Sequence, residues 1–281
     1  MNSLLVGPTT GPTTGPAGDP TGGRRIAANL APEEDDVERD ARRVLWITGG
    51  GSGMGRAVAR TAAAAGWAVA VSGRRADAVQ ETVDDLGGAG LAVPLDVRDG
   101  AAVAAARDRV LGHFGRLDGL VLSAGLNTPR RRWDDQSIAT FHDVVATNLG
   151  APATLIDATL PDLRATGGTV VAVSSYSGWA FHPSAGVAYS ASKTALGSLV
   201  RTLNAQEADH GVRACHLCPG DVATDFLQQR PQVPDEAARA LMLTPEDVAR
   251  TVQFVLDSPA HVRIDELVVS PVTRSTAPTA R

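Results

Sequence analysis

The sequence predicts an α/β domain built on a doubly wound, parallel β-sheet. From Arg43 onward, short apolar runs alternate with longer alanine-rich segments of helical character. The apolar runs are nearly continuous, which is typical of strands covered on both faces in a parallel sheet. We therefore expect seven strands with helices on both faces.

The predicted strands are short and rich in Val, Leu and Ala. They are Val44–Thr48, Ala68–Ser72, Leu91–Leu95, Gly119–Ser123, Thr169–Ser174, Val212–Cys218 and Glu266–Ser270. The predicted helices are amphipathic and lie between them. They are Gly53–Ala65, Ala76–Leu86, Ala101–Phe114, Ile138–Leu163, Val187–Asp209 and Pro245–Leu256. The last has a clear start, with Thr244 as N-cap and Pro245 at the first helical position.

A chain of 281 residues with 43% hydrophobic residues is long enough for one large domain. Residues 1–42 combine a Gly-Pro-Thr-Thr repeat with an acidic run, a composition typical of a disordered tail. We expect a single domain over residues 43–273 and a flexible C-terminus over residues 274–281.

Charge and hydropathy exclude several classes of partner. The net charge is −5, with acidic and basic residues mixed along the chain, so neither nucleic acid nor a membrane surface is expected as a partner. No apolar run reaches the roughly 20 residues of a membrane helix. The start Met1–Val6 is too short for a signal peptide, and Arg24-Arg25 precedes no long apolar segment. We expect a cytoplasmic protein.

The two cysteines, Cys215 and Cys218, have C-x-x-C spacing, which can bind metal or carry out redox chemistry. Here they lie on a predicted strand, where residues three apart face opposite sides. We therefore expect ordinary core cysteines and no metal site.

A glycine-rich turn joins the first strand to the first helix. Such a turn lets the backbone approach a pyrophosphate closely, and the helix N-terminus offers unpaired N–H groups to it. A plain flexible turn is the alternative, but the strand–turn–helix context favours nucleotide binding. The expected contacts are Gly49, Gly51, Ser52, Gly53, Met54 and Gly55.

Arg74 follows the second strand at the position where an NAD-binding fold places an acid for the ribose 2′-hydroxyl. A guanidinium there can pair with a 2′-phosphate. The sequence thus favours NADP(H) over NAD, the alternative being a solvated arginine at a helix start.

Lys193 is the one lysine among 26 basic residues, and Tyr189 precedes it by four positions on a predicted helix. Residues four apart share a helix face. A neighbouring ammonium lowers the pKa of a phenol from its usual value near ~10 toward working pH, where a general acid/base is effective. A surface contact is the alternative for an isolated pair.

These features occur in one ordered set. It comprises Thr48-Gly-x-x-x-Gly53-x-Gly55, Asp96-Val97, Ser123-Ala124-Gly125, Asn148, Ser175, Tyr189-x-x-x-Lys193 and Pro219-Gly220. In this order and spacing the sequence resembles the short-chain dehydrogenase/reductase family, NADP-preferring and with a single Rossmann-fold domain. The resemblance covers roughly residues 43–272.

The resemblance implies that Asn148, Ser175, Tyr189 and Lys193 are catalytic. Ser175 orients the substrate oxygen, with Ser174 as the competing choice, and Lys193 also binds the nicotinamide ribose. Asn148 holds a water in a proton relay, or is a buried amide bound to backbone, and both can be true.

By the same resemblance, further residues contact the cofactor. Asp96 and Val97 lie at the adenine, and Ser123, Ala124 and Gly125 lie under the cofactor. Pro219, Gly220, Val222 and Thr224 hold the carboxamide. Two positions depart from the family pattern: Leu122-Ser123 replaces a frequent Asn-Asn pair, and Cys218 replaces a frequent asparagine.

We therefore expect an enzyme that transfers a hydride between NADP(H) and a small carbonyl or alcohol substrate. A cofactor-assisted epimerase or dehydratase and a non-catalytic NADP-binding sensor are the alternatives. By resemblance, the two longest helices form homodimer or homotetramer interfaces.

Substrate contacts should come from segments beyond the strand ends, Asn127–Trp133, Trp179–Ser184 and Asp225–Leu243. The run Arg130-Arg131-Arg132 is more often a solvated charge run than a site for an acidic substrate.

Overall fold

The computed structural model describes residues 42–272, so the predictions for residues 1–41 and 273–281 lie outside the described residues. Seven strands form one sheet in the order β3-β2-β1-β4-β5-β6-β7. Every neighbouring pair is parallel, which confirms the predicted doubly wound sheet. The strand order reverses between β1 and β4, and ligands of such sheets bind outside the carboxyl ends at that point.

The strands match the prediction closely, with one difference at the sheet edge. They are β1 (Val44–Thr48), β2 (Ala68–Ser72), β3 (Gly90–Ala92), β4 (Gly119–Leu122), β5 (Thr169–Val173), β6 (Arg213–Pro219) and β7 (Glu266–Val269). The predicted strand Leu91–Leu95 begins one residue earlier and ends at Ala92, and Pro94 lies where its missing N–H would face the free edge of the sheet. Beyond the end of β3, the amides of Val93 and Leu95 donate to the carbonyl oxygens of Val71 and Gly73, at 2.9 and 3.0 Å.

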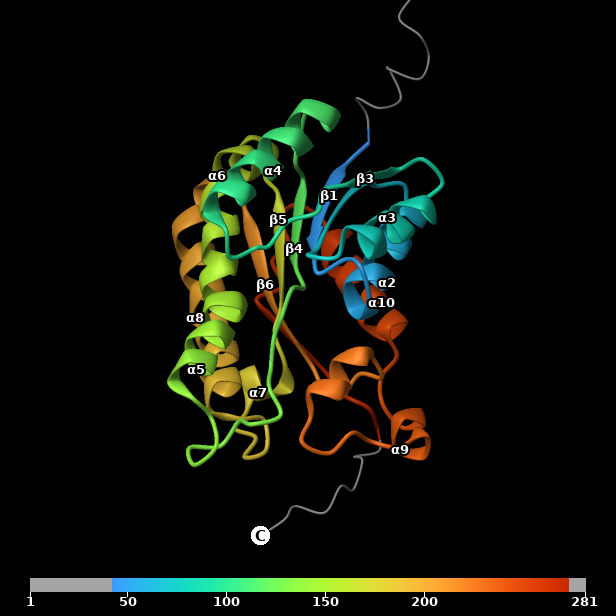
Figure 1. The fold of residues 1–281 in the computed structure, drawn as a ribbon. Helices are drawn as coiled ribbons and strands as arrows, with labels where there is room; N and C mark the ends of the chain where they lie inside the picture. Colours follow the sequence, from blue (N-terminus) through green and yellow to red (C-terminus); the bar gives the residue numbers. More distant parts are fainter. Residues whose placement is uncertain (1–41, 273–281) are drawn as a thin grey trace, which may run out of the picture.

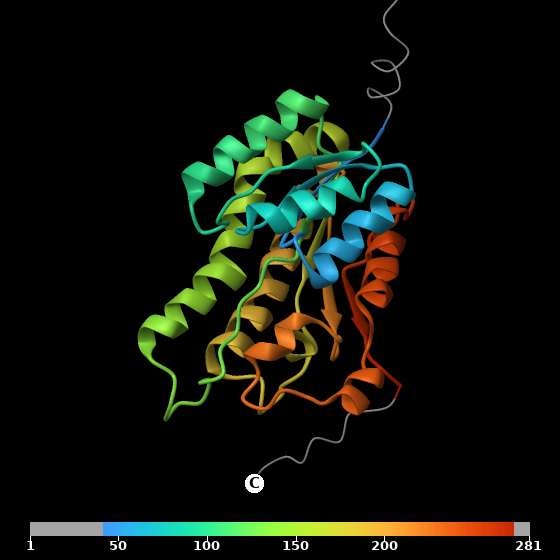
Figure 2. The ribbon, with the colours of Figure 1, turned by 45° about the vertical axis from the view of Figure 1, so that its right-hand side comes forward.

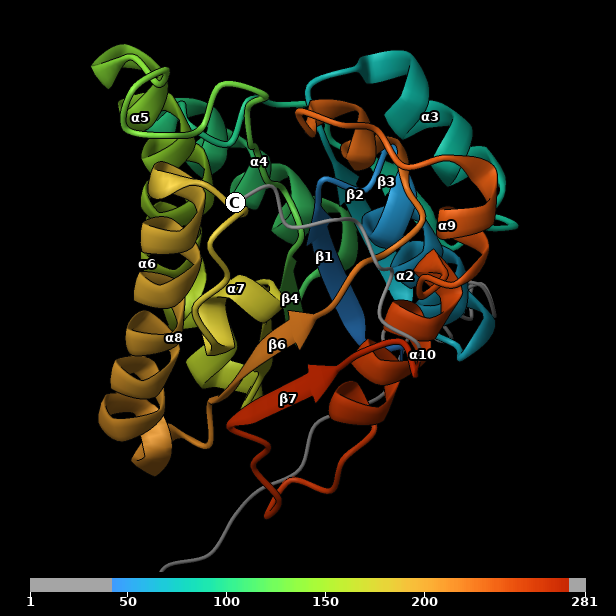
Figure 3. The ribbon, with the colours of Figure 1, turned by 90° about the horizontal axis from the view of Figure 1, so that it is seen from below.

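Two layers of helices cover the sheet (Figures 1 and 3). On one face lie α4 (Gly100–Phe114), α6 (Ala151–Thr166) and α8 (Val187–Glu207). On the other lie α2 (Gly53–Ala64), α3 (Ala76–Asp84) and α10 (Pro245–Leu256). Strand β1 shows why both layers are needed, since Trp46 packs into the first core and Leu45 and Ile47 pack into the second.

Between residues 42 and 272, no helix has the length and apolar character required to cross a membrane.

The predicted helix Ile138–Leu163 is continuous in extent but changes its winding. It consists of α5 (Ile138–Val145), a π-helical turn η1 (Ala146–Gly150) and α6. A π turn accommodates an extra residue and is frequent at functional sites. Here the turn carries Asn148, whose side chain is buried with 1% exposure.

Short elements at the carboxyl end of the sheet were not predicted. They are α7 (Tyr176–Trp179), the 3₁₀ turn η3 (Asp225–Gln229) and α9 (Glu236–Ala240). A further 3₁₀ turn, η2 (Ala208–His210), replaces the predicted end of the long helix. Figures 1 and 2 show α7, η3 and α9 at the same end of the molecule.

Helix α10 offers a direct test of the sequence-encoded helix start. The Thr244 hydroxyl accepts a bond from the Asp247 amide at 3.2 Å, and the Asp247 carboxylate accepts from the Thr244 amide at 2.7 Å. Thr244→Ala should lower the free energy of unfolding by about 1 kcal/mol, measured by urea denaturation. Thr244→Ser keeps the hydroxyl and should stay close to the wild type. Equal losses in both variants would contradict the role of the cap.

Candidate active site

One continuous pocket lies at the carboxyl ends of the strands. Its volume is about 2240 Å³, well above the ~300–1,000 Å³ of ordinary small-molecule sites. That volume accommodates an extended dinucleotide together with a small substrate. All the predicted site residues line this pocket except Asn148, which lies behind it.

The glycine turn forms the floor under the nucleotide end of the pocket. Gly49 has a φ of +68°, a conformation that side chains disfavour. A Cβ on Gly55 would lie 2.4 Å from the Gly49 carbonyl oxygen, so only glycine allows this close packing. Ser52 makes no side-chain cap bond to α2, which leaves the N–H groups of the first turn for a ligand. The turn therefore fits the pyrophosphate of a dinucleotide.

Two arginines and one carboxylate stand at the ends of β2 and β3. Arg74 is exposed on the pocket and, among residues 42–272, has no carboxylate within 4.0 Å. Asp96 is held by Arg98, with 2.7 Å between its Oδ2 and Nη2, and this hydrogen bond holds the pKa of Asp96 below its usual range. Arg98 was not predicted, and only its place two residues after Asp96 could have suggested it.

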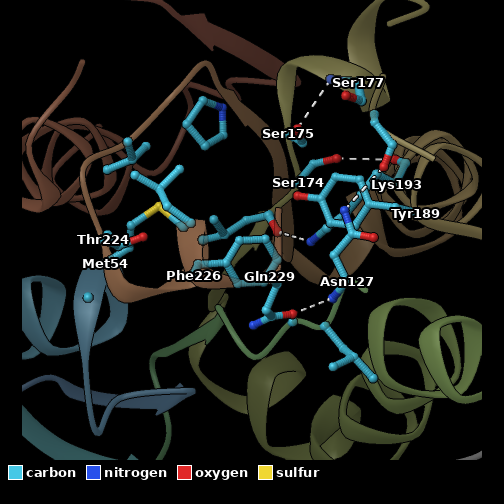
Figure 4. Close-up of a pocket in the computed structure, with 18 of the residues that line it drawn as sticks. Met54, Asn127, Ser174, Ser175, Ser177, Tyr189, Lys193, Thr224, Phe226 and Gln229 are labelled. Carbon is cyan, nitrogen blue, oxygen red and sulfur yellow. Dashed lines mark hydrogen bonds between the residues drawn. The ribbon is translucent and has the colours of Figure 1, made fainter. Parts of the chain in front are cut away.

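Ser174 and Ser175 follow β5 but have different partners (Figure 4). The Ser174 hydroxyl donates to the Lys193 carbonyl oxygen at 3.1 Å, and the residue is buried. The Ser175 hydroxyl accepts a bond from the Ser177 amide at 3.2 Å as the N-cap of α7. Ser174 is thus committed to holding α8, whereas Ser175 keeps its O–H for the pocket.

Tyr189 lies on α8 and faces this pocket. Burial raises the pKa of its phenol above the usual value of 10.0. The hydroxyl of Ser175 lowers it by hydrogen bonding, as do the charges of Arg230 and Arg131, while Asp221 raises it. The expectation that Lys193 lowers this pKa is therefore wrong, because burial outweighs every contact that lowers it. The phenol remains protonated at neutral pH.

Lys193 lies one helical turn further along the same face of α8. Its Nζ donates to the Val173 carbonyl oxygen at 2.8 Å and lies 5.8 Å from the ring centroid of Tyr189. Burial lowers the pKa of Lys193 to about 8. Gly125 lies against both groups, since a Cβ there would be in ordinary van der Waals contact with this Nζ at 3.8 Å and with the Asn148 Oδ1 at 3.7 Å.

Asn148 is engaged with the backbone. Its Oδ1 accepts from the Leu126 amide at 2.7 Å, and its Nδ2 donates to the Leu126 carbonyl oxygen at 2.8 Å. The buried-amide interpretation is therefore correct, and the amide fixes the loop after β4.

The substrate end of the pocket is framed by residues that the motifs do not single out. The backbone amide of Asn127 donates to the Gln229 side-chain oxygen at 2.8 Å, which links the loop after β4 to η3 (Figure 4). The ring of Phe226, also on η3, lies 6.1 Å from that of Tyr189. Asn127 and Gln229 lie in predicted substrate segments, but no local pattern marks them.

The solvated interpretation of the arginine run is wrong for its middle residue. Arg130 and Arg132 are exposed, but Arg131 has 7% exposure. Its Nε donates to the Thr128 carbonyl oxygen at 2.8 Å, and another of its nitrogens donates to the Gln229 carbonyl oxygen. Arg131 therefore ties its own loop to η3.

The cysteines are free and buried, and they lie on opposite faces of β6 as predicted. Cys218 Sγ lies 3.4 Å from His216 Nδ1 and 3.7 Å from Nε2, so it contacts the side of the ring rather than the Nδ1 lone pair. Glu266 Oε2 lies 3.0 Å from the same Nδ1. Burial raises the pKa of the Cys218 thiol to about 12, which disfavours the thiolate that a metal requires.

Comparisons with known proteins agree with this geometry. Residues 43–234 match the family described as short chain dehydrogenase. Sulfoacetaldehyde reductase 2 of Chromohalobacter salexigens is 33% identical, over 83% of this chain and 95% of the relative.

Solved structures give the same result. An alcohol dehydrogenase of Thermococcus sibiricus, complexed with 5-hydroxy-NADP, has a TM-score of 0.75 and 30% identity, covering 82% of this chain and 97% of its own. A serine dehydrogenase complexed with NADP+ has a TM-score of 0.75 and 29% identity, covering 84% and 97%.

The buried ammonium should destabilise the fold. Between pH 8 and 10.5 the unfolded chain binds more protons at Lys193 than the folded chain does, so this residue makes the free energy of unfolding rise with pH there. At pH 7, Lys193→Met should raise that free energy by about 2 kcal/mol, after allowing for the lost bond to Val173. Urea denaturation of the wild type and of Lys193→Met, at pH 7 and at pH 10, measures the free energy of unfolding. A gain of the same size at both pH values would contradict this origin.

Proposed function

The chain belongs to the short-chain dehydrogenase/reductase family, and we propose that it is an NADP(H)-dependent oxidoreductase that interconverts a carbonyl compound and an alcohol. One observation carries the proposal: Ser175, Tyr189 and Lys193 line the same pocket, and the Lys193 Nζ lies 5.8 Å from the Tyr189 ring centroid, one turn along α8. Two adjacent hydroxyls at one point are suited to a single oxygen atom on which charge develops.

The residues at the nucleotide end are suited to a nicotinamide dinucleotide. The glycine turn and the start of α2 would bind the pyrophosphate, and Asp96 and Val97 would lie at the adenine. Arg74 would pair with the 2′-phosphate of NADP(H), because no acid stands there to bind a 2′-hydroxyl. When bound, the cofactor supplies or accepts the hydride.

Tyr189 then moves the proton. In reduction, Ser175 would hold the substrate oxygen by a hydrogen bond while Tyr189 donates its proton to it. The raised pKa of the buried phenol keeps that proton available at neutral pH. In oxidation the phenol must release the proton, and the charge of Lys193 would stabilise the phenolate.

Two other functions fit less well. A non-catalytic sensor does not require the full set of Asn148, Ser175, Tyr189 and Lys193, all of which are present. An epimerase or dehydratase of this family usually has a longer substrate domain than the stretch between Lys193 and β7 provides. Besides the cofactor, a carbonyl reductase requires only Ser175, Tyr189 and Lys193, which line the pocket.

Replacement of the phenol tests the proton step. Tyr189→Phe removes the hydroxyl and keeps the ring against Phe226, so kcat should fall at least about 10³-fold. NADPH absorbance with a panel of ketones and aldehydes measures this loss. Tyr176→Phe, which alters the chain's other tyrosine, is the matched control and should retain activity. Turnover that survives in the Tyr189 variant would exclude this mechanism.

Replacement of the arginine tests cofactor choice. Arg74→Asp removes a charge-assisted contact to the 2′-phosphate, so kcat/KM for NADPH should fall about 100-fold, while that for NADH rises. The neighbouring Arg75→Asp should change the ratio far less. If both variants behave alike, Arg74 has no special role in cofactor choice.

A further inference from the structure

The substrate end of the pocket contains two guanidinium groups near the reacting phenol. Arg131 comes from the loop after β4, and Arg230 directly follows η3. Both line the pocket together with Tyr189, and both act on its ionisation. Neither belongs to the motifs that define the nucleotide end.

Arg131 is a buried cation without an acidic partner. Its guanidinium donates only to backbone carbonyls, those of Thr128, Ala185 and Gln229. In the part of the chain that the structure describes, no carboxylate lies within 4.0 Å of it. Carbonyl dipoles satisfy its N–H groups, and the exposed Asp135 compensates its charge only in part, so burial still lowers the pKa of Arg131. A buried charge without a contacting counter-ion is costly.

The position of Arg131 is fixed on several sides. A Cβ on Gly186, the N-cap of α8, would lie 2.6 Å from the Cβ of Arg131. The Val187 amide donates to the Arg131 carbonyl oxygen at 3.0 Å. The charge is therefore held in place rather than carried by a mobile side chain.

Arg230 is more accessible and has one carboxylate. It forms an ion pair with Asp221, and 33% of its side chain is exposed. A guanidinium has five N–H donors, so Arg230 can keep Asp221 and still bind a second oxyanion. The groups acting on the Tyr189 phenol are thus two cations and one anion, a net positive charge.

Other charged groups nearby do not cancel this charge. Arg132 and Asp134 form their own pair at the exposed mouth, 3.4 Å apart. Asp135 accepts a bond from the Arg132 amide at 2.7 Å, and both Asp135 and Asp225 are exposed. Acids in contact with solvent are screened and neutralise a buried charge poorly.

We propose that the substrate carries an oxyanion, a carboxylate or a sulfonate, that binds Arg230 in the positive field of Arg131 while its carbonyl or carbinol oxygen meets Ser175 and Tyr189. This inference rests on the proposed function and names its substrate class. Arginine is suited to the task because its planar fork binds carboxylate through two parallel hydrogen bonds. A neutral analogue leaves the positive field unmatched, so such a site discriminates strongly against it.

Matched keto acids and methyl esters test the proposal. The probes are pyruvate, acetoacetate and levulinate, which place the carboxylate at increasing distance from the ketone, each with its methyl ester. With NADPH, at least one acid should exceed its ester by tenfold or more in kcat/KM. In Arg230→Gln, kcat/KM for that acid should fall about 10- to 100-fold, mainly through KM, with the ester changed less than about threefold.

Arg130→Gln is the matched control, because Arg130 is exposed and does not line the pocket. This variant should leave kcat/KM unchanged both for the acid and for its ester. Esters that are turned over as well as the acids at every length would overturn the proposal. So would an equal loss for acid and ester in Arg230→Gln, which would indicate that Arg230 only supports the loop.

Binding separates failure of this inference from failure of the proposed function. If no acid, ester or neutral ketone is turned over, the proposed function fails. Calorimetric titration of the NADP+-loaded protein with malonate and with ethanesulfonate then tests, independently of turnover, whether the anion site exists. Binding that Arg230→Gln abolishes supports the site, and absence of binding to the wild type refutes it.

Discussion

The burial of one ammonium at the carboxyl end of β5 is the constraint on which the pocket depends. Lys193 has 4% exposure, donates to the Val173 carbonyl oxygen, and has its pKa lowered to about 8. Such a group is expensive to bury, and the surrounding structure holds it there. Ser174 binds its carbonyl oxygen, and His216 of β6 lies 3.4 Å from the same atom. Helix α8 is thereby fixed to two strands, and Tyr189 is fixed with it.

Charge is distributed unevenly along the pocket, and this links the fold to the proposed chemistry. At the nucleotide end, Arg98 is paired with Asp96, and Arg74 has no carboxylate within 4.0 Å among residues 42–272. At the substrate end, Arg131 is buried with carbonyl partners only, and Arg230 shares Asp221. Each end therefore holds an arginine that contacts no carboxylate of the described residues. A phosphate at one end and an oxyanion at the other would balance both, with the hydride donor and the phenol between them.

Three separate segments meet at the substrate end, and a few hydrogen bonds hold them together. The Ala185 carbonyl oxygen accepts from Asn127 at 3.1 Å and from Arg131 at 3.5 Å, and both residues also bind Gln229. The loop after β4, the segment before α8 and η3 are therefore coupled through one carbonyl and one glutamine.

The sequence by itself determined the sheet, the order of its elements and the motif positions. Apolar strands, glycine turns and the Tyr189–Lys193 spacing are local patterns that can be recognised without knowledge of the fold. The tertiary structure decided what depends on distant partners. Arg131 is buried because its loop meets Gln229, 98 positions away, and Ser174 differs from Ser175 because only its hydroxyl reaches Lys193. The π turn carries Asn148, whose side chain bonds to Leu126, 22 positions away, and helical periodicity indicates neither the turn nor the bond. Periodicity reports which face of an element is apolar, but the partner of a polar group is chosen by packing between elements far apart in the chain.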